Sequence, residues 1–470
     1  MVARYSVRPV RQLLVGDVLW NAAARTPDRV AATLEGQQVT FSELAVTTSG
    51  LCRALAARGV GAGARVVWKG ETRLDAIALA MAVSSLGAVF VPINPRLSAE
   101  EAGPIFDLAD PALVVDSVAL DELLATRRSG GVDDPAVRET DAQVIFFTSG
   151  STGRPKGVEL SHRAVMLRSL VDATPMPAGP AVCMFPSFHM AGWQGPTTSW
   201  LCSDEVVYVA RADAEPLLEA IHARRAVKFY AIPAVWRRIL EADRSGFDLS
   251  CVRQADTGTS ATTPDLLQGI RDAFPTSTTA IMYGSTEVGG ACRLPPDDVL
   301  RKPGSVGPPA VGVAVRLDDG ELLVRSPFLM TGYFRDPEAT AAAMVDGWFR
   351  TGDLAERDAD GYYSIVGRAK DIIRTGGETV APAEVDSVLI GHPAIADAAV
   401  AGVPDDDWGE IVTAFVVLRP GAALDLQQLR AFCDGRLATF KHPRRMVVVE
   451  EIPRTGATRQ VQRRLLVGRS

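Results

Sequence analysis

A loop rich in glycine and hydroxyl residues follows the apolar run 143–147 and combines features that suit phosphate binding. Glycines stand at positions 150, 153 and 157, and Lys156 lies between proline and glycine. Glycines let the backbone approach a ligand closely, hydroxyls and backbone amides donate to anionic oxygens, and the lysine adds a positive charge. The spacing differs from a Walker loop, because position 155 is proline. A flexible linker is the alternative, but a linker rarely follows an apolar strand directly.

Three further segments place polar residues at the ends of apolar runs. Residues 255–260 end in glycine and hydroxyl residues, and residues 281–287 end in tyrosine, glycine, two hydroxyl residues and Glu287. Asp353 lies in the third segment, and a carboxylate with two acceptor oxygens suits a vicinal diol. Structural alternatives stay open, because a hydroxyl residue can cap a helix and an aspartate after glycine is common in turns.

Alternating helix-like and strand-like patterns supply the scaffold for these segments. They predict helices near 14–24, 44–58 and 74–85 and strands at 30–34, 65–68 and 321–325. Thr40 and Glu43 form a predicted capping box, and Thr263 is a predicted N-cap. Such alternation predicts an α/β fold with a helix-covered sheet.

Composition indicates an ordinary globular protein of two or more domains. The chain has 470 residues, 47% of them apolar and 22% charged, and a net charge of −7. This charge argues against a broad nucleic-acid-binding face. The longest apolar stretch, residues 76–93, contains serine, glycine and proline and reads as a helix followed by a strand, so no membrane span is expected. We therefore expect a cytoplasmic protein.

The loop at residues 146–158 closely resembles the phosphate-binding signature of the adenylate-forming superfamily, which includes acyl-CoA synthetases, luciferases and adenylation domains. The segments around residues 255–260, 281–287 and 347–354 are similar to nucleotide-site segments of that family. The resemblance implies a large N-terminal domain of helix-covered mixed β-sheets, residues 1–367. It also implies a small mobile α+β C-terminal domain, residues 368–470, most similar to that of fatty-acid or aryl-acid CoA ligases.

The resemblance also implies roles for individual residues. The catalytic set would be Lys156, Thr286, Glu287 and Arg459, with Mg²⁺ held by Thr152 and Glu287. ATP and CoA would be bound by Thr148, Ser149, Gly150, Ser151, Thr152, Gly153, Lys156, Gly258, Tyr283, Gly284, Thr286, Asp353, Arg368, Lys370, Gly376 and Gly377. Within this set, Tyr283 would stack on adenine, Asp353 would bind the ribose, Lys370 would be the pivot, and Gly376 and Gly377 would line the pantetheine tunnel. The acid pocket would be lined by Phe188, His189, Trp193, Gly258 and Val288, although Phe188, His189 and Trp193 also fit a buried core.

The tail departs from the family pattern at residues 452–464. Relatives carry a lysine a few residues after Pro-Arg-Thr, where it reaches the reacting carboxylate and the α-phosphate. An ungapped match places Arg459 there, and a match through the following Val-Gln-Arg-Arg places Gln460 there. Arginine keeps the charge but is planar and longer, and glutamine loses the charge. Adenylation is therefore expected to be slow, differently assisted or directed at an unusual substrate.

The resemblance implies ATP-dependent activation of a carboxylic acid as an acyl-adenylate, followed by transfer to the thiol of CoA, with ATP, Mg²⁺ and CoA as cofactors. Three alternatives stay open. The chain could load a carrier protein, activate a non-carboxylate such as nitrite, or bind nucleotide without catalysis. The sequence decides neither the acid nor the oligomeric state.

Overall fold

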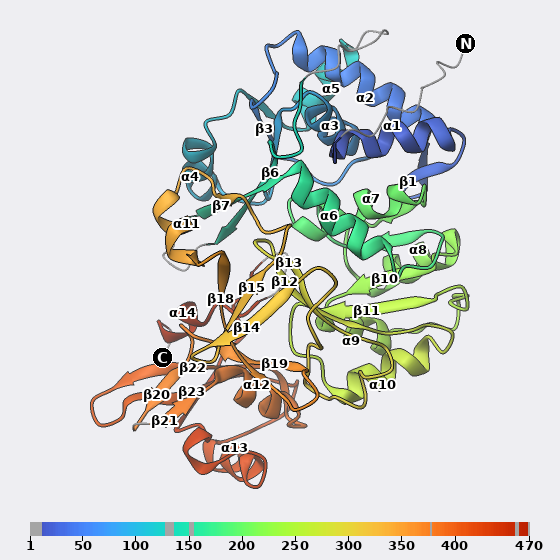
Figure 1. Cartoon of the computed structure of the whole chain (residues 1–470). Helices are drawn as coiled ribbons and strands as arrows, with labels where there is room; N and C mark the ends of the chain where they lie inside the picture. The colour runs from blue at the N-terminus through green and yellow to red at the C-terminus, as the bar shows by residue number, and fades with distance from the viewer. Residues whose placement is uncertain (1–11, 127–135, 150–154, 377, 456–459, 469–470) are drawn as a thin grey trace.

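The structure is a computed structural model that describes residues 12–126, 136–149, 155–376, 378–455 and 460–468. Four β-sheets with flanking helices make up these residues. Figure 1 shows the C-terminal sheet, coloured orange to red, at the opposite end of the molecule from the blue N-terminal helices. The predicted fold class, a large domain of mixed sheets with a smaller α+β domain, is confirmed.

A six-stranded sheet carries the edge of the phosphate loop. Its strand order is β16-β7-β6-β4-β3-β5, with bounds Gly332–Tyr333, Pro155–Ser161, Ala142–Ser149, Val89–Pro92, Arg65–Trp68 and Leu113–Val115. The helices of this region are α1 (Val15–Arg25), α2 (Phe41–Ala56), α3 (Leu74–Ser85), α4 (Ala99–Ala109) and α5 (Ser117–Ala125). The predicted capping box forms, since Thr40 and Glu43 bond each other's backbone amides at the start of α2.

An eight-stranded sheet lies beside the first. Its order is β13-β12-β11-β10-β8-β9-β1-β2, with bounds Gly289–Leu294, Ile281–Ser285, Gln254–Gly258, Lys228–Ala231, Ala181–Cys183, Val206–Tyr208, Val30–Leu34 and Gln37–Thr40. The chain segment that forms it also contributes α6 (His162–Ala173), α7 (Met190–Leu201), α8 (Ala214–Arg224), α9 (Pro233–Glu241) and α10 (Pro264–Ala273). The strands from β11 back to β1 run parallel, so the carboxyl ends of β10 and β11 meet at one edge of the sheet.

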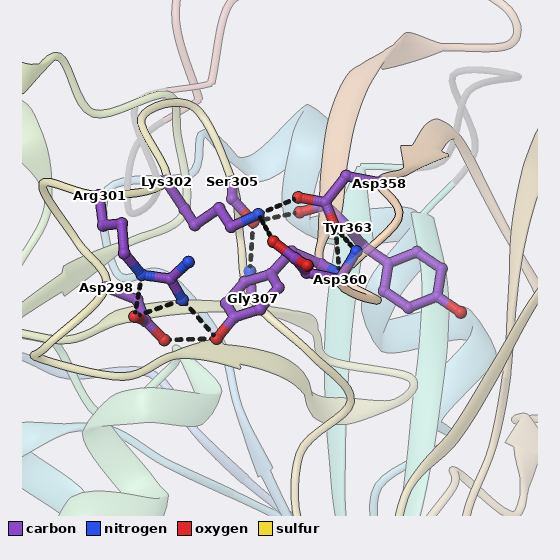
Figure 2. Close-up of polar contacts among 9 residues, drawn as sticks. Asp298, Arg301, Lys302, Ser305, Gly307, Asp358, Asp360 and Tyr363 are labelled. Atoms are coloured by element: carbon purple, nitrogen blue, oxygen red, sulfur yellow. Dashed lines mark hydrogen bonds and ion pairs between the residues drawn. The ribbon is translucent and has the colours of Figure 1, made fainter.

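A five-stranded antiparallel sheet precedes the C-terminal sheet in the chain. It comprises β14 (Ala314–Asp318), β15 (Glu321–Arg325), β17 (Met344–Val345), β18 (Trp348–Arg357) and β19 (Tyr363–Arg368), with α11 (Pro337–Ala343) inserted before β17. Figure 2 shows how the turn between β18 and β19 is anchored: Lys302 Nζ lies 2.6 Å from Asp358 Oδ2 and 2.5 Å from Asp360 Oδ2. This anchor fixes the hairpin that carries Asp353 and Arg368.

The C-terminal sheet has a hydrophobic core of its own. It contains β20 (Ile373–Thr375), β21 (Glu378–Val380), β22 (Ile395–Asp405), β23 (Gly409–Leu418) and β24 (Arg445–Val448), with helices α12 (Pro382–Ile390), α13 (Leu426–Cys433), η1 (Thr439–Lys441) and α14 (Arg463–Val467). Side chains such as Val385, Leu389 and Val412 form a cluster distinct from the main core. None of the helices in the described ranges has the length and apolar composition needed to cross a bilayer.

Candidate active site

One large cavity, about 2520 Å³ in volume, brings together residues from all four sheets. Lys156 from β7, Tyr283 from β12 and Thr351 from β18 line it on the side of the large domain. Asp386 from α12 and Gln460 from the tail line it on the side of the C-terminal domain. Lys156 of the predicted phosphate loop and Gln460 of the tail therefore face the same cavity.

The base of the phosphate loop is a β-hairpin. Strands β6 and β7 are antiparallel, and Thr148 pairs with Lys156. The Thr148 hydroxyl donates to the Lys156 carbonyl at 3.5 Å, and Lys156 Nζ lies 4.7 Å from the centre of the Tyr333 ring. The backbone of Ser149 belongs to β6, whereas Gly150, Ser151, Thr152 and Gly153 lie outside the described residues. The described part therefore presents Lys156 to the cavity from the end of a strand pair.

Glu287 lies on the turn between β12 and β13 and faces the same space. The Tyr333 hydroxyl donates to Glu287 Oε1 at 3.3 Å, so Tyr333 links the carboxylate to Lys156. In the described part of the chain, no group of three His, Cys, Asp or Glu side chains is placed to hold a metal. One carboxylate beside the phosphates of ATP is a common protein contribution to Mg²⁺ binding, so Glu287 fits this ion. The predicted second ligand, Thr152, is outside the described residues.

Arg168 on α6 supports this turn and was missed by the sequence reasoning. Its guanidinium donates to the carbonyls of Thr286 at 2.9 Å and Glu287 at 3.0 Å, and twice to Phe328 at 2.8 and 3.0 Å. Only 2% of the residue is exposed. Burial lowers the pKa of Arg168 to about 10, and the group stays protonated at neutral pH. The glycine at position 289 is the trace that this packing leaves in the sequence, because a Cβ there would lie 2.9 Å from Arg168 Nε.

Asp353, Tyr283 and Arg368 form a second cluster. The Tyr283 hydroxyl donates to Asp353 Oδ2 at 2.5 Å, and Arg368 Nε lies 2.6 Å from Asp353 Oδ1. Burial raises the pKa of Asp353, while the charge of Arg368 lowers it. Each carboxylate oxygen has two lone pairs, so Asp353 can still accept from a diol. The structure thus brings together three residues that the sequence placed in one nucleotide site.

The acid-pocket candidates divide into two groups. Phe188 and His189 line the cavity, and His189 also caps α7, with Nδ1 accepting from the Ala191 amide at 3.2 Å. Burial lowers the pKa of His189 to about 4, so its ring is neutral at pH 7. Trp193 lies in the core instead, because its indole donates to Gln143 Oε1 at 3.0 Å and its ring packs on Phe90.

Gly258 and Val288 also lie outside the set of cavity-lining side chains. Val288 is 1% exposed and belongs to the main core. At Gly258, a Cβ would lie 2.2 Å from the Met282 carbonyl oxygen and 2.7 Å from the Tyr230 hydroxyl. Gly258 is therefore required by close packing of β11 on β12.

The predicted hinge residue and the predicted pantetheine loop lie between the end of β19 and the start of β21. Lys370 is exposed and lines the cavity. Gly376 has φ +58°, and a Cβ there would lie 2.5 Å from the Trp408 ring, so only glycine fits this position. Gly377 lies outside the described residues.

Thr455 and Gln460 of the tail bond to each other and line the cavity. The Thr455 amide donates to the Gln460 carbonyl at 2.8 Å, and the Gln460 amide donates to Thr455 Oγ1 at 3.0 Å. Arg459 falls outside the described residues, whereas Gln460 lines the cavity. Downstream, Arg463 Nε donates to the Val400 carbonyl at 2.9 Å, which fixes the start of α14.

Comparison with known proteins gives this site its context. The family model for AMP-binding enzymes matches residues 19–334, and the model for the AMP-binding enzyme C-terminal domain matches residues 384–459. The chain belongs to the AMP-binding enzyme family.

Several characterised relatives of this family member are CoA ligases. Indoleacetate–CoA ligase of Aromatoleum aromaticum is 32% identical, over 95% of this chain and 97% of that protein. Feruloyl-CoA synthase of Amycolatopsis is 33% identical, over 93% of this chain and 95% of that protein.

Solved structures with a similar fold support the same family assignment. o-Succinylbenzoate CoA synthetase from Bacillus subtilis, in complex with its acyl-adenylate intermediate, has a TM-score of 0.88 at 27% identity and covers 96% of this chain and 97% of its own. ATP-bound MatB from Rhodopseudomonas palustris also has a TM-score of 0.88 at 27% identity, with 97% and 99% covered. The predicted superfamily, the AMP-forming acid–thiol ligase class and the use of ATP, Mg²⁺ and CoA are confirmed.

Proposed function

We propose that this AMP-binding enzyme activates a largely apolar carboxylic acid as its acyl-adenylate and transfers the acyl group to CoA, with the residue roles given below. The observation that carries this proposal is the shared cavity. It is lined by Lys156, Glu287, Tyr283 and Arg368, with Asp353 bonded to the last two, and also by Phe185 and Phe188. This shared lining supports triphosphate, ribose and acid subsites in one cavity.

In the first step, a carboxylate oxygen attacks the α-phosphorus of ATP, and the bond from that phosphorus to the bridging oxygen breaks to release pyrophosphate. Lys156 would hold the departing phosphates, and the backbone and hydroxyl of Thr286 would lie beside the α-phosphate. Glu287 would hold Mg²⁺, which supplies positive charge against the phosphate oxygens when bound. Asp353 would accept from the ribose hydroxyls and so position the nucleotide.

In the second step, the CoA thiolate attacks the acyl carbon, and AMP leaves with one oxygen of the original carboxylate. We propose that the C-terminal domain, starting after residue 367, first rotates about Lys370. This rotation would withdraw the tail turn and bring the loop at Gly376 to the cavity. The exposure of Lys370 between β19 and β20 supports a pivot there.

The tail residue that replaces the usual lysine is either Arg459 or Gln460. Two separate variants, Arg459→Lys and Gln460→Lys, distinguish them by the rate of pyrophosphate release. The variant that restores the lysine at the functional position should speed adenylation, while the other should not. If both variants lose activity, the native tail has a role that lysine cannot replace.

Turnover with a panel of aryl, alicyclic and fatty acids tests the proposal. We expect formation of AMP, pyrophosphate and an acyl-CoA that depends on ATP, Mg²⁺ and one class of acid. Lys156→Ala should slow ATP use, whereas the exposed control Arg163→Lys should not. Formation of thioester on a holo-carrier protein but not on CoA would identify the carrier-loading alternative, and AMP formation only with nitrite and an amine would identify the non-carboxylate alternative.

If the protein binds ATP but releases no pyrophosphate with any acid, with a carrier protein or with nitrite, the proposal is contradicted and a non-catalytic role is supported. The cytoplasmic location stays a prediction, which fractionation of the native cells can test.

A further inference from the structure

The acid pocket continues past His189 along one face of helix α7. The residues of α7 that line it are Met190, Ala191, Gln194, Gly195, Thr198 and Ser199, which recur every three to four positions. This spacing places them on a single helix face. At 1.5 Å per residue, the face runs for about 13 Å away from the end of α7 that His189 caps.

The opposite wall is the face of the eight-stranded sheet. In the parallel pair β10 and β11, Lys228 pairs with Gln254 and Tyr230 with Asp256. All four line the cavity, as expected for positions that alternate along a strand. Gly258 ends β11 next to the Tyr230 hydroxyl, so Asp256 and Gln254 lie roughly 7 and 13 Å back along the strand from that end.

This deep end is polar, although the entrance is apolar. The Gln194 amide donates to Asp172 Oδ2 at 2.5 Å, and the Gln254 amide donates to Asp256 Oδ2 at 2.6 Å. Asp256 also accepts from the Ala280 amide at 2.8 Å. A hydrocarbon tail would meet carboxylate and amide groups here, so the pocket does not match a simple fatty-acid tunnel.

Two acceptor groups at this end have lone pairs that no described residue uses. Gln254 is 7% exposed, and its Oε1 has no hydrogen-bond partner. Among the described residues, the Asp172 carboxylate accepts from the Gln194 amide alone. Burial raises the pKa of Asp172 to about 6. Buried polar groups are normally paired, so these are candidates for ligand contacts.

Both groups can take a further hydrogen-bond donor. The carboxylate of Asp172 has spare lone pairs beside its bond from Gln194, and the amide oxygen of Gln254 accepts hydrogen bonds. The nearby cations are already engaged. Lys228 Nζ lies 2.8 Å from Asp204 Oδ2, Arg293 Nη2 lies 3.7 Å from Asp256 Oδ2, and the Arg168 guanidinium donates to backbone carbonyls. A ligand group that donates hydrogen bonds would complete the set.

We propose that Asp172 and Gln254 form a specificity subsite for a hydroxyl or amino group carried by the acid substrate at the end remote from its carboxylate. The proposal rests on the function proposed above and narrows its substrate class. It assigns the apolar entrance to the body of the acid and the deep end to a distal hydrogen-bond donor. The matching acids are hydroxylated or aminated ones whose donor reaches roughly 7 to 13 Å past Gly258.

Paired acids test this subsite on the full chain. The pairs are octanoic against 8-hydroxyoctanoic and 8-aminooctanoic acid, and 3-phenylpropanoic against 3-(4-hydroxyphenyl)propanoic acid. We expect kcat/KM for acyl-CoA formation to be at least tenfold higher for a donor-bearing acid than for its parent on at least one scaffold. The hydroxyl and amino arms distinguish which donor is preferred.

Variants of the subsite residues test which side chains cause the preference for a donor-bearing acid. Asp172→Asn and Gln254→Leu should each lower the ratio of donor-bearing to parent acid at least fivefold, while the exposed control Asp107→Asn should leave it unchanged. ATP-induced thermal stabilisation checks that each variant is folded. The subsite would be overturned, and the proposed function left intact, by either of two results. The first is a kcat/KM for the donor-bearing acid no higher than that for its parent on both scaffolds. The second is a ratio of these two values that neither variant changes. No AMP from any acid would overturn both.

Discussion

Replacing the buried guanidinium of Arg168 with lysine should separate the support of the Glu287 turn from general folding. One guanidinium joins the carbonyls of Thr286 and Glu287 to that of Phe328, using Nε, Nη1 and Nη2. A lysine keeps the charge but has a single nitrogen, which cannot reach both segments. At least one buried carbonyl would lose its partner, so the apparent free energy of unfolding should fall by about 1 to 3 kcal/mol.

The functional consequence should appear in the dependence on Mg²⁺. Without the two hydrogen bonds to its backbone, the turn that carries Glu287 is held less firmly, and the Mg²⁺ concentration for half-maximal pyrophosphate release should rise several-fold. Chemical denaturation and Mg²⁺ titration measure the two effects. Arg163→Lys is the matched control on the same helix, because the Arg163 side chain is 49% exposed and, among the described residues, forms an ion pair with Glu139 alone.

Two results would refute this reasoning. Unchanged stability of Arg168→Lys would mean that lysine satisfies the same carbonyls or that they do not need a charged donor. Lower stability with an unchanged Mg²⁺ dependence would mean that Arg168 is structural only and does not position Glu287.

Three further predictions follow from single contacts. Asp353→Ala should raise the KM for ATP tenfold or more, about 1.4 kcal/mol or more, because the ribose acceptor is lost, and an unchanged KM would remove Asp353 from the site. Gly376→Ala should slow thioester formation more than adenylation, because φ is +58° and the Cβ meets Trp408, and single-turnover kinetics with and without CoA measure this. His162 is buried with its pKa lowered to about 4, so the protein loses stability from this group as pH falls from about 6.5 towards 4. Relative to His162→Gln, the native chain should lose about 1.4 kcal/mol between pH 7.5 and pH 5.5 in denaturation experiments, and a constant difference would contradict the buried neutral ring.

Local patterns predicted much of the fold. The helix at 74–85 and the strands at 30–34, 65–68 and 321–325 agree with the observed bounds. These elements have apolar runs or a regular alternation that neighbouring residues alone define. The capping box at Thr40 also required only neighbouring residues. Local chemistry was therefore sufficient for these parts.

Parts of the site depend on contacts that the sequence pattern does not show. Arg168 looks like an ordinary basic residue on a helix, and only the packing of α6 against the turn after β12 makes it a buried donor. Trp193 shares its helix with Gln194, but a rotation of about 100° per residue turns the tryptophan to the core and the glutamine to the cavity. The polar deep end likewise arises from the register of β10 with β11.

Oxygen transfer tests the central claim most directly. The preferred acid, labelled with ¹⁸O at both carboxylate oxygens, is incubated with ATP, Mg²⁺ and CoA, and the products are analysed by mass spectrometry. Attack of the carboxylate on the α-phosphorus predicts one ¹⁸O in AMP, none in pyrophosphate and one in the acyl-CoA. Unlabelled AMP, or label in phosphate or pyrophosphate, would contradict an acyl-adenylate intermediate.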